Sequence, residues 1–373
     1  MKIEPFGVEI WMNAHETTCA FNLAETCVHS MTIGELLALT GRNDTALSEL
    51  LPMRMTYGSI EGSDRLRDAV TGLYARQLRE NVIVTHGTVG ANDLVHRAMV
   101  SAGDRVVSIV PTYQQHTAIP ASLGAEVAEL PLRAEDGYLP DLAALRRLVT
   151  PGTRLLTLTN PNNPTGSLMP RAMMDEVVAI ARDAGAWLLA DEVYRGTEQE
   201  GTVITPSFAD LYELGIGTAG MSKAFSLAGL RLGWIAAPRE VIEAVSIHRD
   251  YTTISVGMID DHFAGLALEN ASKVLARSRG IVRTNLAILD GWVHATPGVS
   301  YVKPQAGTTA MLAYGLEMPS REFCTRLLAD TGVMFVPGDV FGIEEHVRIG
   351  YACATDVLRE GLARTGAWIV GQG

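Results

Sequence analysis

The sequence predicts an α/β fold in which a mostly parallel sheet carries helices on both faces and is joined to a smaller α+β domain. Continuous apolar runs alternate with amphipathic stretches through the middle of the chain, as in strands that are buried on both faces. Polar residues gather directly after four of these runs, at the edge where open α/β sheets bind ligands. A chain of 373 residues is also too long for one compact core.

The elements follow in chain order. Strands of the large sheet are expected at 82–87, 105–111, 155–160, 186–192, 217–220 and 232–236, with helices at 91–100 and 170–184. A long helical pattern, rich in Ala, Leu and Arg, runs from 268 to 289. The α+β part has predicted strands at 299–302, 310–313, 333–336 and 347–349, and helices at 321–331 and 355–362. We predict a large domain at 41–284 and a small domain formed by 1–40 and 285–373.

Composition excludes several classes of function. The net charge of −12 argues against a nucleic-acid partner, because phosphate backbones require clustered Lys and Arg. No secretory signal or membrane-spanning run is visible, since Glu4, Pro5 and Glu9 interrupt the N-terminal segment. The four cysteines lack C-x-x-C spacing, so no metal site is predicted and reduced thiols in a cytoplasmic protein are expected.

Four polar loops are predicted to meet at one edge of the sheet. They are Gly87–Thr88, Tyr113, 160–166 and 191–194, and each follows a different strand. The carboxyl ends of parallel strands lie together, so these loops are expected to surround one ligand.

Five segments resemble the class I and II aminotransferases, which are fold-type-I enzymes that use pyridoxal 5′-phosphate (PLP). In the order of that family they read YGSIEGSDRLRDAV (57–70), NPNNPTG (160–166), DEVYRG (191–196), TAGMSKAFSLAGLRLGW (218–234) and RIGYACA (348–354). Each segment alone is moderately specific, whereas five in order cover nearly the whole chain. The resemblance implies a seven-stranded sheet in the large domain, a PLP cofactor and a homodimer.

The resemblance assigns the catalytic roles to three residues. Lys223 holds the cofactor as a Schiff base and later moves the proton of the substrate Cα. Asp191 pairs with the pyridine nitrogen and keeps the ring protonated, and Tyr194 bonds the 3′ oxygen of the ring. Asn163 is expected at the same oxygen and beside the substrate.

The remaining cofactor contacts follow from the same resemblance. The backbone of Gly87, Thr88 and Val89 would hold the phosphate at a helix start, together with Ser222 and with Arg231, eight residues after Lys223. Tyr113 would stack on the ring of the cofactor.

Two further residues concern the substrate and the partner chain. Arg348 matches the arginine that binds the α-carboxylate of the substrate, for which a planar guanidinium is suited. Tyr57 matches a tyrosine that reaches the phosphate of the neighbouring subunit, which implies active sites shared across the dimer.

Three positions depart from the family pattern. Gly220 stands where Ser or Thr is common, three residues before Lys223. Glu25 stands where backbone usually lines the pocket, and we hypothesise that it contacts a cationic or polar part of the substrate; a salt-bridged surface role is the alternative. Gln115 and His116 either line the pocket or belong to a solvated loop.

The predicted activity is transfer of the amino group of an L-amino acid to a 2-oxo acid. The same set of cofactor-binding and catalytic residues can support other carbanion chemistry, so γ-elimination, γ-replacement or C–C bond formation is the alternative. DEVYRGT also resembles the segment of 1-aminocyclopropane-1-carboxylate synthases, which act on S-adenosylmethionine. A transcription regulator would need an added DNA-binding domain, and no basic helix-turn-helix segment is present.

Overall fold

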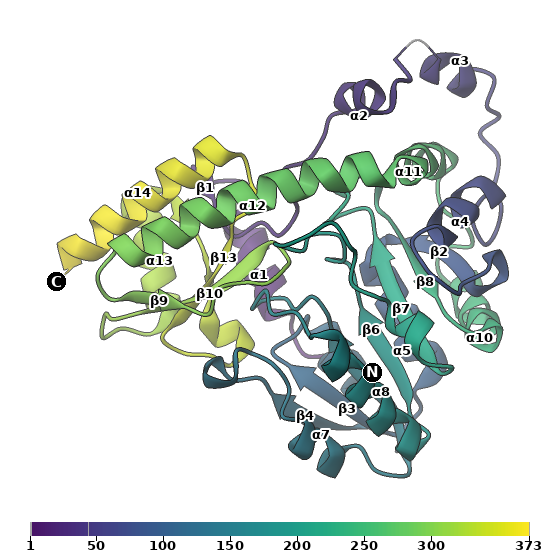
Figure 1. The fold of residues 1–373 in the computed structure, drawn as a ribbon, viewed down its shortest axis with the longest axis horizontal. Coiled ribbons are helices and arrows are strands. Elements are labelled where there is room, and N and C mark those ends of the chain that lie inside the picture. The colour runs from purple at the N-terminus through teal and green to yellow at the C-terminus, as the bar shows by residue number, and fades with distance from the viewer. Residues whose placement is uncertain (1, 44, 373) are drawn as a thin grey trace.

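The computed structural model describes residues 2–43 and 45–372, and its larger sheet has seven strands (Figure 1). In spatial order these are β2 (Val82–His86), β8 (Leu232–Ala236), β7 (Gly215–Gly220), β6 (Trp187–Asp191), β5 (Thr153–Thr159), β3 (Arg105–Val110) and β4 (Glu126–Pro131). Strand β8 runs antiparallel to both neighbours, and the other pairs are parallel. The predicted fold, with a mostly parallel seven-stranded sheet, is confirmed.

Helices surround this sheet on both faces. They are α4 (Asp64–Thr71), α5 (Gly87–Met99), α6 (Gln115–Ser122), α7 (Leu142–Leu148), α8 (Arg171–Ala184), α9 (Phe208–Leu211), α10 (Arg239–Asp250) and α11 (Met258–Glu269). Two further helices, α2 (Ile33–Thr40) and α3 (Ala46–Leu50), project away from the sheet (Figure 1). Short 3₁₀ helices lie at Arg79–Asn81, Ala134–Asp136, Ala228–Leu230 and Gly338–Phe341.

The two faces of the sheet are buried in separate apolar clusters. In β6, the side chain of Leu188 packs in a cluster with Val177 of α8, whereas Leu189 packs with Val95 of α5 and Val241 of α10. Successive strand residues point to opposite faces, so a strand covered on both sides must be apolar throughout. The sandwich of helices and sheet thereby fixes the carboxyl ends of β5 and β6, where polar side chains begin.

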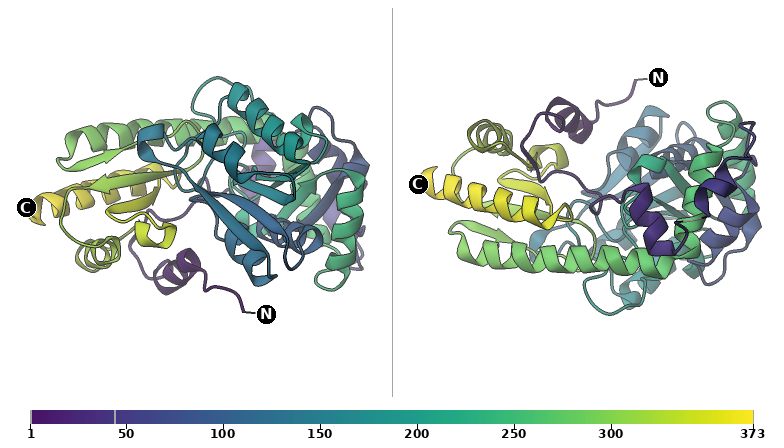
Figure 2. Two further views of the ribbon diagram at one scale, coloured as in Figure 1. Left: turned by 90° about the horizontal axis from the view of Figure 1, so that it is seen from below. Right: turned by 90° about the horizontal axis from the view of Figure 1, so that it is seen from above.

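The smaller domain is built around a four-stranded antiparallel sheet. Its strands, in spatial order, are β12 (Val336–Pro337), β13 (His346–Gly350), β10 (Thr309–Tyr314) and β9 (Val299–Tyr301). Near it, β1 (Phe21–Asn22) pairs in parallel with β11 (Val333–Met334). Helices α1 (Gly7–His15), α13 (Ser320–Thr331) and α14 (Thr355–Gln372) complete this domain, and Figure 2 shows α14 beside the long helix α12 (Ala271–Ala295).

Helix α12 packs in an apolar core of each domain. Val274 and Leu275, near its start, pack in the cluster that contains α11, while Val282 and Leu286 pack in the core of the small domain. One continuous helix therefore joins the two domains. The boundaries at 40/41 and 284/285 remain a prediction.

Four elements differ from the predictions. Strand β4 was not expected, because it is a half-exposed edge strand with a weak apolar pattern. Helix α5 begins at Gly87 and not at Ala91. The helical pattern at 268–289 comprises the end of α11 and most of α12, which meet at Asn270, whose side chain bonds the carbonyl of Leu266.

The fourth difference is α1. Its residues Val8, Trp11 and Met12 are buried in the core of the small domain, and Trp11 Nε1 donates a 2.7 Å hydrogen bond to the carbonyl of Phe335.

Within the described ranges, none of the helices combines the length and apolar character needed to cross a membrane.

Candidate active site

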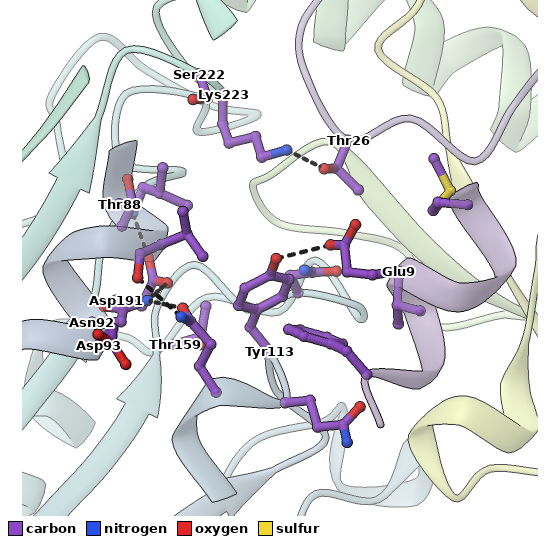
Figure 3. Close-up of a pocket in the computed structure, with 18 of the residues that line it drawn as sticks. Glu9, Thr26, Thr88, Asn92, Asp93, Tyr113, Thr159, Asp191, Ser222 and Lys223 are labelled. Atoms are coloured by element: carbon purple, nitrogen blue, oxygen red, sulfur yellow. Dashed lines mark hydrogen bonds between the residues drawn. The ribbon is translucent and has the colours of Figure 1, made fainter. Parts of the chain in front are cut away.

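A cavity of about 830 Å³ opens at the carboxyl ends of the large sheet and is also lined by α1 and β13 (Figure 3). Eleven of the predicted site residues line it: Glu25, Thr88, Val89, Tyr113, Asn163, Asp191, Tyr194, Ser222, Lys223, Arg231 and Arg348. Gly87 lies beside Arg231, since a Cβ on Gly87 would lie 3.1 Å from Arg231 Nη2. The four polar loops therefore converge as expected, and both domains contribute.

Lys223 follows β7 and extends its amine into this cavity. The Nζ atom donates a 2.5 Å hydrogen bond to Thr26 Oγ1, and it lies 3.6 Å from Cys27 Sγ and 3.9 Å from Glu25 Oε1. Burial alone would lower the pKa of Lys223, but the surrounding groups Cys27, Tyr194 and Glu25 raise it above its usual value. The free amine is thus held as an ammonium by acceptors on the segment 25–27.

Asp191 ends β6 with a carboxylate that is only 4% exposed. Its Oδ2 accepts a 2.9 Å hydrogen bond from Asn92 Nδ2, and its Oδ1 accepts one of 3.1 Å from the Val193 N–H. Thr218 Oγ1 donates to Asn92 Oδ1 at 2.7 Å, which fixes the amide orientation. These bonds hold a buried acceptor that faces the cavity, as a partner for a cationic ring nitrogen requires.

His116 lies behind Asp191 and does not line the cavity. Its Nε2 is 3.8 Å from Asp191 Oδ2, and its Nδ1 is 2.8 Å from Thr157 Oγ1 and 3.2 Å from His96 Nε2. Burial, and then the neighbouring His116, hold the pKa of His96 well below its usual value. Of the two alternatives for Gln115 and His116, the pocket lining is right for Gln115, which donates to the carbonyl of Val89, and neither is right for His116, which is fully buried outside the lining.

The turn from β2 into α5 forms an anion cradle. Gly87 begins the helix with φ +66°, a left-handed conformation that glycine adopts without strain, and Thr88 follows it. The buried Thr88 Oγ1 has no hydrogen-bond partner among the described residues. Arg231 brings its guanidinium to the same turn. An orphan hydroxyl, a helix start and a guanidinium together suit a phosphate group.

Arg348 enters the cavity from β13 of the small domain and is 3% exposed. Its Nη2 donates to the carbonyl of Ala24 at 2.9 Å and its Nη1 donates to Asn163 Oδ1 at 3.3 Å, whereas Nε has no partner among the described residues. Burial lowers the pKa of Arg348, and the charges of Glu25 and Glu9 act in the opposite direction. A buried guanidinium with an unused donor is suited to an incoming carboxylate.

Glu25 has a local structural role that was not predicted. Its Oε1 accepts hydrogen bonds from the N–H groups of Thr26 at 2.7 Å and Cys27 at 2.9 Å. Burial would raise the pKa of Glu25, but the charge of Lys223 and these N–H donors lower it. Glu25 thus braces the segment that holds the Lys223 amine.

Sequence reasoning missed the wall that α1 contributes. Tyr113 OH donates a 2.8 Å hydrogen bond to Glu9 Oε1, and the Tyr113 ring packs against Phe6 with ring centroids 4.7 Å apart. Gln114 clamps the start of α1, because it accepts from the Gly7 N–H at 2.9 Å and donates to the carbonyl of Pro5 at 3.0 Å. No local motif marks these contacts, which join positions more than 100 residues apart.

Tyr57 lies outside the cavity lining, with 75% of its surface exposed. Large apolar neighbours on the same stretch of chain are exposed too, among them Leu51 at 83% and Met55 at 71%. Within one protomer, the predicted phosphate contact of Tyr57 is not made.

Comparisons with known proteins agree with this geometry. Residues 42–365 match the family model described as aminotransferase class I and II. Capreomycidine synthase of Streptomyces vinaceus is 32% identical over 95% of this chain and 91% of its own length. Among solved structures, a PLP-dependent aminotransferase from Streptococcus suis aligns with a TM-score of 0.96 at 40% identity, covering 100% of this chain and 99% of that one. The PLP-dependent cyclase OrfR aligns with a TM-score of 0.93 at 27% identity over 100% and 99%.

These relatives imply PLP, and the cavity fits that cofactor. The unpartnered Thr88 hydroxyl and Arg231 lie where a phosphate would be held, and Asp191 presents a buried carboxylate to a ring nitrogen. The Lys223 amine projects into the same cavity. The cofactor and the enzyme class expected from the sequence are confirmed, while the individual residue roles stay predictions.

Proposed function

We propose that this chain, which belongs to the class I and II aminotransferase family and uses PLP, moves the amino group of an L-amino acid to a 2-oxo acid. The observation that carries the proposal is the pairing of two functions in one cavity. Arg348 offers an unused donor for a carboxylate from one domain, and Lys223 offers an amine from the other. Chemistry at Cα of an amino acid needs one group that holds the α-carboxylate and another that reaches the Cα proton.

When bound, PLP supplies an electron sink for negative charge at the substrate Cα. Lys223 would hold the cofactor covalently, and its Nζ would then take the proton from Cα and pass it to the cofactor. Asp191, fixed by Asn92, would keep the proton on the ring nitrogen. Tyr194 and Asn163 line the same cavity and are proposed to bond the 3′ oxygen of the ring.

The other proposed roles concern anchoring. Thr88, with the backbone of Gly87 and Val89, would hold the phosphate together with Ser222 and Arg231, because the turn leaves a helix start and a buried hydroxyl free for it. Tyr113 would lie against the ring of the cofactor, and its hydrogen bond to Glu9 restricts the position of its ring. Arg348 would orient the substrate through its α-carboxylate.

We also propose a homodimer in the cytoplasm. The exposure of Tyr57 and its apolar neighbours supports a partner surface, in which Tyr57 completes the phosphate site of the other protomer. The free thiols of Cys19, Cys27, Cys324 and Cys353 support a reducing compartment.

A second candidate function is a PLP-dependent cyclisation or a γ-elimination or replacement. It is favoured by the likeness to capreomycidine synthase and to the cyclase OrfR, both of which align along nearly the whole chain. In this family the pocket selects which bond breaks, so the same anchoring residues serve both candidates.

The absorbance spectrum of the holoenzyme separates the two. Each amino acid of a panel, and S-adenosylmethionine, is added in turn, and products are identified by mass spectrometry. Conversion of the cofactor to its amino form, with release of a 2-oxo acid and reversal by a second 2-oxo acid, supports amino transfer. A cyclised or eliminated product that appears without net amino transfer supports the second candidate and overturns the first.

A further inference from the structure

The charges that line the cavity do not balance once the proposed roles are assigned. The basic side chains are Lys223, Arg231 and Arg348, which serve the cofactor, its phosphate and the α-carboxylate of the substrate. The acidic side chains are Glu4, Glu9, Glu16, Glu25, Asp93 and Asp191. Among the described lining residues, no further Lys, Arg or His stands against these carboxylates.

Two of the six acidic groups have partners outside the substrate, and Glu25 lies 3.9 Å from the Lys223 amine, which is assigned to the cofactor. Asp191 faces the cofactor ring in the proposed mechanism, and Asp93 pairs with Arg97 at 2.8 Å outside the lining. The remaining four glutamates all belong to the N-terminal segment 4–25. The substrate side of the cavity therefore carries more acidic than basic side chains, and these glutamates all come from the N-terminal segment.

Glu9 is held through one of its two carboxylate oxygens. Figure 3 shows it on α1, with Tyr113 between it and Asp191 in this view. The Tyr113 hydroxyl engages Oε1, while Oε2 is bonded by no residue in the described ranges. Burial first, and then the charge of Glu9, raise the pKa of Tyr113, so this phenol stays a donor at neutral pH.

The helix that carries Glu9 is anchored to both domains. Trp11 bonds the carbonyl of Phe335 in the small domain, and Gln114 of the large domain makes two hydrogen bonds to the backbone of Pro5 and Gly7. A carboxylate with one oxygen fixed and one oxygen unused, on a doubly anchored helix, is preorganised to bind a donor.

Arg348 supplies an independent indication of how a substrate lies. It is 3% exposed, two of its nitrogens are fixed by Asn163 and Ala24, and Nε is unpartnered. A carboxylate bound there places the substrate Cα between Arg348 and Lys223. The charges of Glu25 and Glu9 both act on Arg348, so both glutamates lie within electrostatic range of the bound substrate.

We propose that the substrate is an L-amino acid whose side chain ends in an ammonium or guanidinium group, and that Glu9 is the main residue that recognises this cation. The inference rests on the proposed function, which supplies the use of Arg348 and Lys223. A neutral side chain would leave the second Glu9 oxygen desolvated and unpaired, and an acidic side chain would meet repulsion from several glutamates. A cationic side chain would pair with the second Glu9 oxygen and would be attracted by the negative charges of Glu16, Glu4 and Glu25.

The decisive comparison uses L-arginine and L-citrulline, which have nearly the same shape and differ in the charge of the terminal group. L-ornithine, L-lysine and L-glutamate complete the panel, and kcat/KM is measured on the holoenzyme. Wild-type enzyme is expected to prefer its best cationic substrate over citrulline by at least about tenfold, the usual scale for a hydrogen bond to a charged group. Equal values for the cationic and neutral side chains would overturn the inference.

Variants then assign the preference to Glu9. Glu9→Gln keeps an oxygen for the Tyr113 hydroxyl and removes the charge, so kcat/KM for the cationic substrate should fall about 10- to 100-fold, while citrulline changes by less than about threefold. Glu240→Gln changes the net charge equally on an exposed part of α10 and should alter neither. A parallel loss for both substrates in Glu9→Gln would assign Glu9 a structural role and contradict the inference.

Charge reversal offers a gain of function. In Glu9→Arg, the preference should shift from cationic side chains toward L-glutamate, and a retained cationic preference would overturn the assignment. Failure of this inference is distinguishable from failure of the proposed function. Neutral amino acids that transfer their amino group as well as cationic ones contradict the inference alone, whereas cationic amino acids that bind preferentially without yielding a 2-oxo acid contradict amino transfer alone.

Discussion

The hydroxyl of Thr88 occupies the space into which a side chain on Gly220 would extend. A Cβ built on Gly220 would lie 2.5 Å from Thr88 Oγ1, closer than two such atoms approach, and 3.0 Å from the carbonyl oxygen of Leu232. The departure from the family pattern at Gly220 is therefore coupled to Thr88. Helix α5 therefore supplies a hydroxyl beside the phosphate site, and the lack of a side chain at Gly220 in β7 leaves room for it.

Loss of that hydroxyl should weaken cofactor binding. In Thr88→Val, which keeps the branched shape, PLP is expected to bind about tenfold more weakly, because a hydrogen bond to a charged phosphate is lost. Thr88→Ser is the matched control and should remain near wild type. Gly220→Ser should also weaken PLP, by displacing Thr88. Cofactor dissociation constants from reconstitution of the apoenzyme measure all three, and unchanged affinity in Thr88→Val would contradict the assignment.

Replacement of Lys223 by Ala should abolish turnover, because both the covalent anchor and the group that moves the Cα proton are removed. Mass spectrometry after borohydride reduction should find the cofactor attached to Lys223 in wild type and no attachment in the variant. Lys303→Ala, at an exposed ion pair with Asp290 in the small domain, is the control and should retain activity. Substantial turnover by Lys223→Ala would remove Lys223 from the mechanism.

The side-chain amide of Asn92 should affect catalysis because it holds the Asp191 carboxylate in place. Asn92→Ala removes the 2.9 Å hydrogen bond to Asp191 Oδ2 and leaves Thr218 Oγ1 with only its longer 3.5 Å hydrogen bond to the Ala190 carbonyl. We expect kcat to fall about tenfold, the scale of one hydrogen bond to a charged group, with a much smaller change in KM. Asn92→Asp places a second carboxylate beside Asp191 and should be worse still. Steady-state kinetics and the pH profile of kcat check this, and an effect confined to KM would argue against it.

Sharing of the active sites can be tested by mixing inactive chains. Lys223→Ala and Tyr57→Ala are each expected to have low activity, and a mixed dimer contains one site with both native residues. Refolding the two variants together should therefore raise activity above that of either alone, provided that Tyr57 acts on the partner's site. Sedimentation analysis checks the dimer itself. No gain on mixing would contradict the assignment of Tyr57 to the partner's site.

The carboxylate of Glu25 should contribute to stability in a pH-dependent way. Its pKa is lowered in the folded protein, so its contribution is present above the pKa of the unfolded chain and is lost as the pH falls through the folded value. The window lies below about pH 4.5. Since 42% of the side chain is exposed, we expect Glu25→Gln to cost no more than about 1 kcal/mol at pH 7.

Denaturant unfolding of the cofactor-free protein at pH 7 and at pH 3 measures this difference, which should shrink at the lower pH. The same variant separates two roles of Glu25. A change in stability without a change in substrate preference identifies a brace for the segment 25–27, whereas a change in preference supports contact with the substrate.

The sequence was sufficient for the sheet and for most of the cavity, because both depend on local signals. Buried strands such as β6 are apolar throughout, and the residues that follow them, including Asp191 and Lys223, belong to segments with a family pattern. The edge strand β4 lacks that signal, since Leu130 alone among its six residues is fully buried. The position of His116 could not be predicted from its polar neighbours, because they are compatible with a solvated loop whereas the ring is buried beside Asp191.

The contribution of α1 was invisible for a different reason. Glu9 meets Tyr113 across 104 positions of sequence, and Trp11 meets Phe335 across 324. Contacts at such separation leave no periodicity or spacing in a single sequence. A helix of only nine residues is also hard to distinguish from an exposed segment of chain.

The long-range anchoring of α1 sets an order of events during synthesis. Trp11 is synthesised 324 residues before Phe335, whose carbonyl fixes it, and Arg348 follows later still. Until then, α1 can make only its contacts with residues 113 and 114, because closing the larger loop yields no contact before its far end exists. The nascent large domain can pack its sheet first, and the wall that carries Glu9 is the last part of the pocket to be assembled.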